Sequence, residues 1–225
     1  MRLKAENISK KYFRRTGEAN WFYAVEPAKL ELEEGTVTVL TGRSGSGKTT
    51  LLNMLAGILT PSEGRVFYDD TDIYSLKDRT LSRLRNEKTG VIPQGRSAVE
   101  TLTVMENILL PAMLYGGEAN EEAATAVMVE LGILGLKDAR PAELSGGELR
   151  RMAICRALCH DPGIILADEP TGDLDDDNTR LVLEIFRRAA HEKGRTVLLV
   201  SHENEAVNYA DRVLTCHAGK IAEAN

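Results

Sequence analysis

The sequence is poor in cysteine and in positive charge. Its 225 residues include 3 cysteines, an odd number with no C-x-x-C spacing, which excludes a disulfide framework and predicts reduced thiols. Cys155 and Cys159 lie four residues apart on a predicted helix, but two further ligands are missing, so packing is favoured over a metal site. The net charge of -6 argues against a nucleic-acid binder held by a basic face.

Long hydrophobic runs are also missing. No apolar stretch is long enough to span a bilayer, and residues 1–4 do not open a signal peptide. Internal repeats and low-complexity segments are absent as well. We therefore expect a cytosolic protein, in which any membrane span must be provided by a partner.

The composition and the order of predicted elements favour an α/β fold. A hydrophobic content of 43% and a charged content of 28% are ordinary for a globular protein. The length allows one large domain or two small ones. Apolar runs at residues 36–41, 163–167 and 196–200 alternate with helical segments, which predicts a mostly parallel sheet covered on both faces. Short strands are expected before residue 70, and residues 212–221 are expected to form a hairpin.

The middle of the chain is predicted to be helical. Thr103 and Glu106 have the spacing of a capping box. Pro111 is expected to interrupt or kink the helix that follows them. Gly116-Gly117 predicts a break, and Asn120 is a suitable N-cap for the next helix.

A glycine-rich segment at residues 42–49 carries the strongest chemical signal. It fits G-x-x-x-x-G-K-[ST], with a β-rich run before it and apolar residues at helical spacing after it, namely Leu51, Leu52, Leu55 and Ile58. Backbone N–H groups of such a loop converge on nucleotide phosphates. Lys48 would reach the β- and γ-phosphates and the Thr49 hydroxyl would ligate Mg²⁺. A plain glycine-rich connection is disfavoured because Lys-Thr follows the last glycine and both flanks are correct. The segment consists of Gly42, Arg43, Ser44, Gly45, Ser46, Gly47, Lys48 and Thr49.

Two other strand ends carry acid–base groups. The apolar run at 164–167 ends in Asp168, placed to anchor Mg²⁺, and Glu169, placed to polarise an attacking water. His202 follows the run at 196–200 and would lie at the same sheet edge, within reach of the γ-phosphate. Taken alone, the acidic pair would be interpreted as a solvated turn and His202 as a surface histidine. The phosphate loop in the same chain favours the functional interpretation of both.

The segment Leu144-Ser145-Gly146-Gly147-Glu148 has two interpretations. Ser145 and Glu148 stand three residues apart, which predicts a capping box for the following helix. The same helix N-terminus, with Ser145, Gly146 and Gly147, could also bind an anion. The local sequence supports both interpretations.

In this order, residues 42–49, Gln94, 144–148, 164–169 and His202 resemble the nucleotide-binding domain of an ABC transporter over nearly the whole chain. The resemblance implies one ATPase domain at 1–225: a P-loop NTPase (RecA-like) α/β core at 1–93 and 158–225, an N-terminal antiparallel β subdomain, and an α-helical subdomain inserted at about 94–157. It implies ATP and Mg²⁺ as cofactors.

The resemblance also assigns roles to single residues. Gln94 touches Mg²⁺ and links the site to the membrane partner, and Thr50 belongs to the phosphate-binding set. Asp175 lies in the loop that contacts the opposite monomer. Tyr12 stacks on adenine, and the alternatives in the same region are Phe13, Trp21 and Phe22.

A further implication is a head-to-tail homodimer that forms with ATP. Each nucleotide would lie between the P-loop of one copy and Ser145, Gly146, Gly147 and Glu148 of the other. The partner would be a transmembrane permease, which holds the domain at the inner face of the cell membrane. Nucleic acid is not an expected partner.

A narrower likeness is to the lipoprotein-releasing, macrolide-export and antimicrobial-peptide-export ATPases, carried by residues 102–107 and 169–175. Three positions depart from the usual pattern. Pro93 replaces an aromatic residue, Asp173 replaces an asparagine, and Glu148 stands where glutamine is common.

Two other functions are weighed against a transporter ATPase. A non-transport ABC ATPase acting on the ribosome or DNA usually has a long coiled coil or two cassettes, and this acidic chain has neither. An inactive regulatory cassette is disfavoured by the intact Lys48, Asp168, Glu169 and His202.

Overall fold

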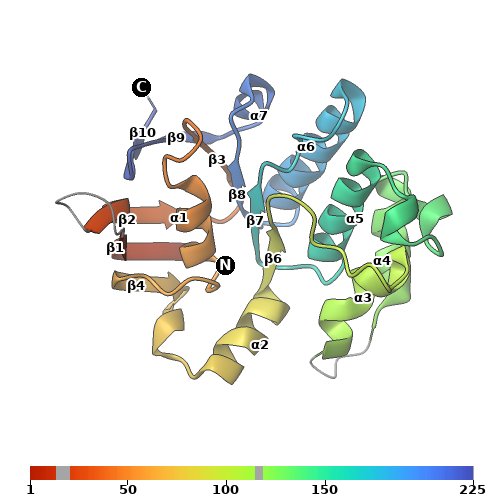
Figure 1. Ribbon diagram of the computed structural model, residues 1–225, viewed down its shortest axis with the longest axis horizontal. Coiled ribbons are helices and arrows are strands. Elements are labelled where there is room, and N and C mark those ends of the chain that lie inside the picture. Colours follow the sequence, from red (N-terminus) through yellow and green to blue (C-terminus); the bar gives the residue numbers. More distant parts are fainter. Residues whose placement is uncertain (14–20, 115–118, 225) are drawn as a thin grey trace.

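Two β-sheets form the centre of the molecule, and their strands alternate in the first part of the chain (Figure 1). The computed structural model describes residues 1–13, 21–114 and 119–224. The smaller sheet is antiparallel, with strand order β2-β1-β4-β5. It confirms the expected N-terminal antiparallel subdomain, and its strands are β1 Leu3–Phe13, β2 Trp21–Leu32, β4 Glu63–Tyr68 and β5 Thr71–Asp72.

The larger sheet is parallel except at one edge. Its order is β10-β9-β3-β8-β7-β6, and only the β9–β10 pair is antiparallel among the described strands. The buried strands read as continuous apolar runs because helices and the second sheet cover both faces. The strands are β3 Val37–Thr41, β6 Thr89–Ile92, β7 Ile164–Asp168, β8 Thr196–Val200, β9 Arg212–His217 and β10 Lys220–Glu223.

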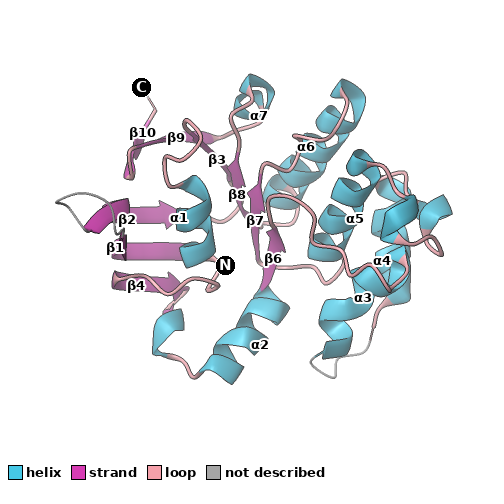
Figure 2. Cartoon of the chain, in the orientation of Figure 1, coloured by secondary structure: helices cyan, strands magenta, loops and turns pink. Residues whose placement is uncertain are grey.

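Seven α-helices surround the sheets in the described residues (Figure 2). Helices α3, α4 and α5 gather beyond β6 and β7, on the side away from the antiparallel sheet. Among the described residues, no helix is long and apolar enough to cross a membrane. The helices are α1 Lys48–Leu55, α2 Asp78–Lys88, α3 Val104–Leu114, α4 Glu121–Glu130, α5 Gly146–Leu158, α6 Asp176–His191 and α7 Asn204–Asn208.

The core lies on both faces of the parallel sheet because successive strand residues point to opposite sides. Leu40, Leu166 and Leu198 face α1 and the antiparallel sheet. Their neighbours Val39 and Ile165 belong to the other cluster, with α6 and α3–α5. These clusters fix the directions in which the strands end, and therefore the position of the loops that follow them.

The helical predictions are confirmed in part. The Thr103–Glu106 capping box is formed, and the Asn120 side chain caps α4 by accepting from the N–H of Ala123. The Gly116-Gly117 break lies outside the described residues. The expected division of the chain at about 94 and 157 stays a prediction.

Two local expectations are wrong. Helix α1 ends at Leu55 rather than reaching Ile58, because Gly57 adopts a φ of 68° that terminates a helix. Helix α3 runs through Pro111 to Leu114, so the expected interruption is wrong, and the alternative of a kink at Pro111 stays a prediction. Burial of Ile108 and Leu109 on that helix outweighs the loss of one backbone hydrogen bond.

Candidate functional site

The loop between β3 and α1 requires glycine at two positions. Gly42 has a φ of 151° and Gly47 a φ of 109°. A Cβ atom on Gly42 would lie 2.3 Å from the carbonyl oxygen of Cys216, and one on Gly47 would lie 2.1 Å from that of Ala24. The loop is therefore held between β2 and β9, with no room for a side chain on either side.

The C-terminal hairpin of β9 and β10 also contacts the phosphate loop. The backbone N–H of Gly219 donates to the Ser46 carbonyl at 2.9 Å, and the Cys216 thiol donates to the same carbonyl at 3.1 Å. Gly219 also accepts from the N–H of Glu26 on β2 at 2.9 Å. Three segments that are far apart in the sequence therefore fix the shape of one loop.

Lys48 lies at the centre of the loop. The residue is buried, and its Nζ donates to the carbonyl oxygens of Gly42 at 2.7 Å and Arg43 at 3.1 Å. Helix α1 begins at Lys48, and its N-cap, Gly47, has no side chain to accept from the first N–H groups. Free helical N–H groups, the helix dipole and an ammonium group together form an anion site.

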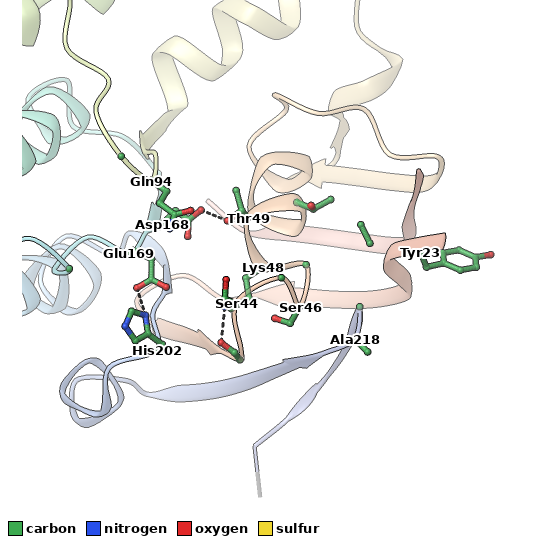
Figure 3. Close-up of a pocket in the computed structure, with 18 of the residues that line it drawn as sticks. Tyr23, Ser44, Ser46, Lys48, Thr49, Gln94, Asp168, Glu169, His202 and Ala218 are labelled. Carbon is green, nitrogen blue, oxygen red and sulfur yellow. Dashed lines mark hydrogen bonds and ion pairs between the residues drawn. The ribbon is translucent and has the colours of Figure 1, made fainter. Parts of the chain in front are cut away.

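Asp168 faces this helix from the end of β7. Its Oδ2 accepts a hydrogen bond from the Thr49 hydroxyl at 2.6 Å (Figure 3). Asp168 is buried, and burial raises the pKa of its carboxyl group while the bond from Thr49 opposes that rise. Figure 3 shows Gln94 on the same side of the site as Asp168. The structure therefore brings the three predicted Mg²⁺ residues to one place.

Glu169 and His202 form a contact across two strand ends. Nδ1 of His202 lies 2.8 Å from Oε2 of Glu169 (Figure 3). The carboxylate raises the pKa of His202 above its ordinary value through this hydrogen bond. Glu169 has a φ of 50°, an uncommon conformation for a residue with a side chain, and its N–H donates to the Val200 carbonyl at 2.9 Å. The turn places the Glu169 carboxylate beside the His202 ring, at the edge of the cavity that the phosphate loop also lines.

These groups line one cavity of ≈ 860 Å³, which is large enough for a nucleotide. The predicted residues Gly42, Gln94, Asp168, Glu169, His202 and all of 44–50 line it. Arg43 does not, and contributes its carbonyl to Lys48 instead.

Several lining residues were missed by sequence reasoning. Ala24 and Gly219 approach the loop through the backbone, which leaves no signal in residue type, and Ala218 also lines the cavity. Arg150 and Asp173 also line the cavity. Asp173 was noticeable as a departure from the usual asparagine, but nothing in the sequence connected it to Arg150.

The aromatic residues expected near adenine lie on the paired strands β1 and β2. Tyr12 lies opposite Phe22 in the β1–β2 register, with ring centroids 6.0 Å apart. Phe22 and Tyr23 line the cavity and Tyr12 does not, although the Tyr23 ring points away from the loop in Figure 3. Trp21 packs edge-on against Phe13 at 5.3 Å. Which ring stacks on adenine stays a prediction.

Ser145 and Asp175 are caps of neighbouring helices. The Ser145 hydroxyl accepts from the N–H of Glu148 at 3.3 Å and the Glu148 Oε2 accepts from the N–H of Ser145 at 2.8 Å, which confirms the capping box. Asp175 Oδ1 accepts from the N–H of Asn178 at 2.9 Å at the start of α6. The described residues that line the cavity include neither cap, nor Gly146 and Gly147. A single chain therefore does not bring these predicted residues to the phosphate loop.

The oxygen ligands fit a magnesium ion that is shared with a nucleotide. The described residues contain no group of three His, Cys, Asp or Glu side chains that could hold a metal alone. The Thr49 hydroxyl and the Asp168 carboxylate are hard donors beside a phosphate-binding loop. Mg²⁺ favours this combination of few protein ligands with phosphate oxygens.

Comparisons with known proteins agree with this geometry. Residues 25–172 match the family described as ABC transporter. The lipoprotein-releasing system ATP-binding protein LolD of Aquifex aeolicus is 37% identical, over 97% of this chain and 95% of its own. An uncharacterized ABC transporter ATP-binding protein of Methanocaldococcus jannaschii, MJ1508, is 38% identical over 98% of each chain.

Solved structures give the same result. The ATP-binding cassette MJ0796, in a dimeric post-hydrolysis state bound to ADP and Pi, superposes with a TM-score of 0.90 at 30% identity, covering 99% of both chains. A second dimeric structure of MJ0796 has a TM-score of 0.91. These neighbours are similar over the full fold, including the α-helical part.

Proposed function

This chain belongs to the ABC transporter family as an ATP-binding, ATP-hydrolysing subunit, and we propose that it powers a transmembrane permease of the lipoprotein-releasing, macrolide-export or antimicrobial-peptide-export type. The similarity to LolD over nearly the whole chain supports this type of partner. The domain would then lie in the cytoplasm, at the inner face of the membrane, held there by the permease.

The observation that carries the proposal is the meeting of three strand ends at the phosphate loop. The Thr49 hydroxyl and Asp168, 2.6 Å apart, would hold Mg²⁺ together with Gln94. When bound, this ion neutralises charge on the phosphate oxygens. Lys48 and the first N–H groups of α1 bind the β- and γ-phosphates.

Glu169 is placed to act as the general base. Its carboxylate would accept a proton from the water that attacks the γ-phosphate, and Nδ1 of His202, 2.8 Å from Oε2, holds this carboxylate in position. His202 is more exposed than Glu169, so its ring can also reach a bound γ-phosphate. Residues 42–50 bind the phosphates without taking part in proton transfer.

A second copy of the chain would complete the site. Ser145, Gly146 and Gly147 form a helix N-terminus outside the cavity of their own chain, which suits them to the γ-phosphate held by a partner. Glu148 and Asp175 would lie at the same interface. The dimeric state of the MJ0796 cassettes supports a head-to-tail homodimer that ATP stabilises. The comparisons point to transporter ATPases, which leaves an action on the ribosome or DNA without support.

The substitution Glu169→Gln tests the proposal. Loss of the base should lower ATP turnover by at least about 100-fold. ATP affinity should stay within a factor of about two because the phosphate contacts are unchanged. Light scattering after gel filtration should show a dimer that persists with ATP. Glu192→Gln, at an exposed glutamate directly after the last residue of α6, is the matched control. Turnover at the unmodified rate in Glu169→Gln would refute the assignment.

A further inference from the structure

Arg150 is a buried cation at the edge of the nucleotide cavity. Its side chain is 4% exposed, and it lies on α5, a little more than one turn after Ser145. It lines the cavity although Gly146 and Gly147 of the same helix do not. A buried guanidinium is costly unless it has partners, so its contacts show what it stabilises.

The contacts of Arg150 join two functional loops. Nη1 donates to the carbonyl oxygen of Pro93, the residue directly before Gln94, at 2.8 Å. Nη2 lies 3.8 Å from Oδ2 of Asp173, two residues before Asp175. One guanidinium therefore spans the loop that carries the proposed Mg²⁺ and permease contact and the loop that carries the proposed dimer contact.

A second arginine fixes the far end of the Gln94 loop. Arg156, also on α5, donates from Nη1 to the Ser97 carbonyl at 2.8 Å and from Nη2 to the Ser97 hydroxyl. Between the two anchors lie Gln94, Gly95 and Arg96. Gly95 has a φ of 76°, and a Cβ atom placed there would have nothing within 4 Å. This short span has space to move, so the anchors determine where Gln94 lies.

Asp173 lies where its charge can hold the Arg150 side chain in position. Its backbone packs on the start of α5, where a Cβ atom on Gly147 would lie 3.1 Å from the Asp173 carbonyl oxygen. Its carboxylate is 58% exposed, so it can respond to events at the surface of the molecule while still facing the buried cation.

We propose that Arg150 is a positioning residue for Gln94, and that the charge of Asp173 holds Arg150 in place, so that the Gln94 loop and the Asp175 loop shift together. The inference rests on the proposed function for the roles of Gln94 and Asp175. Dimer formation at one loop would then change the position of the permease contact at the other through a pair of charges within one chain.

Hydrogen exchange of the nucleotide-free chain tests the coupling directly. Arg150→Gln should speed exchange of the amides at residues 94–97 at least about tenfold, because the loop loses the charged hydrogen bond that holds Pro93. Asp173→Asn, an isosteric change at an exposed side chain, should speed exchange of the same amides about threefold, although it lies on another loop. The double variant should match Arg150→Gln alone, because Asp173 acts only through Arg150.

A metal titration provides the second measurement. The Mg²⁺ concentration that gives half-maximal ATP turnover should rise about tenfold in Arg150→Gln and about threefold in Asp173→Asn. Binding of Mn²⁺ with ATP to these variants in a Glu169→Gln background, followed by electron paramagnetic resonance, should weaken by the same factors. Arg180→Gln removes an exposed arginine of α6 that pairs with Glu205, and should change none of these values.

The inference is overturned if Asp173→Asn leaves exchange at 94–97 unchanged. Effects that multiply in the double variant would also overturn it, as would faster exchange spread evenly over α5 and β6, because Arg150 would then only stabilise the fold. The proposed function fails separately, if the unmodified chain does not hydrolyse ATP. If ATP turnover falls in Glu169→Gln but its Mg²⁺ dependence is unchanged in Arg150→Gln, the proposed function stands and the coupling through Arg150 is refuted.

Discussion

The N-termini of α1 and α5 resemble each other locally and differ in what their first N–H groups contact. Helix α1 follows Gly47, which has no side chain, and its first residue is Lys48. Helix α5 follows Ser145, whose hydroxyl accepts from the N–H of Glu148, while the Glu148 carboxylate accepts from the N–H of Ser145. The first helix is open to an anion, and the second is closed by its own side chains.

The surrounding charges increase this difference. Lys48 adds a cation to the start of α1, and the cavity opens in front of it. The start of α5 has two carboxylates nearby, those of Glu148 and Asp173, and its residues 145–147 do not line the cavity in front of α1. A helix N-terminus with glycines is therefore not a phosphate site by itself. The second one needs a phosphate delivered by another molecule, already held in place.

Of the substitutions that test this difference between α1 and α5, Lys48→Ala should have the largest effect. Removing a buried ammonium from the first N-terminus should weaken ATP binding by at least about 100-fold, or about 3 kcal/mol. Calorimetric titration with ATP would measure it. Lys193→Ala, at an exposed lysine, serves as control. Unchanged affinity would show that α1 does not bind the triphosphate.

A carboxylate at the second N-terminus should separate binding from turnover. Gly146→Asp has room, since a Cβ atom there would lie 3.8 Å from the nearest atom outside α5. ATP affinity of the isolated chain should stay within about twofold, whereas turnover should fall about 100-fold because the added charge repels the partner's phosphate. Gly135→Asp, at another open glycine, should be neutral. Equal losses of affinity and turnover would place α5 in the same-chain site and remove the contrast.

The smallest expected effect concerns folding. Ser145→Ala removes the cap of α5 and should lower the free energy of unfolding by about 1 kcal/mol. Glu148→Gln keeps the capping-box pattern and should change it by only a few tenths of a kcal/mol. Urea unfolding would measure both. A neutral Ser145→Ala would mean that the serine is retained for phosphate contact and not for the helix.

Much of the site could be predicted because its chemistry lies at strand ends. Asp168 and His202 follow apolar runs that read clearly as buried strands, and parallel strands bring such ends to one edge. The phosphate loop was identified from its spacing and its flanks. The Ser145–Glu148 box was correct in geometry, but the sequence could not choose between cap and anion site, since both use the same atoms.

The rest depended on tertiary contacts. Arg150 reads as an ordinary helical residue, and only the packing of α5 places it between Pro93 and Asp173. The choice among Tyr12, Phe22 and their neighbours depends on hairpin register, which shifts at bulges in the β1–β2 pair. Pro111 shows that burial can override a strong local signal.

The contacts of the phosphate loop with β2 and with the C-terminal hairpin have a practical consequence for genome annotation. A gene copy truncated after residue 211 would keep every short signature by which such proteins are recognised, from the lysine to the histidine. It would nevertheless lack the carbonyl of Cys216, which packs against Gly42, and the N–H of Gly219, which donates to the Ser46 carbonyl. A search for the sequence motifs alone would classify such a truncated gene as an active ATPase. A search that also requires the C-terminal hairpin would reject it.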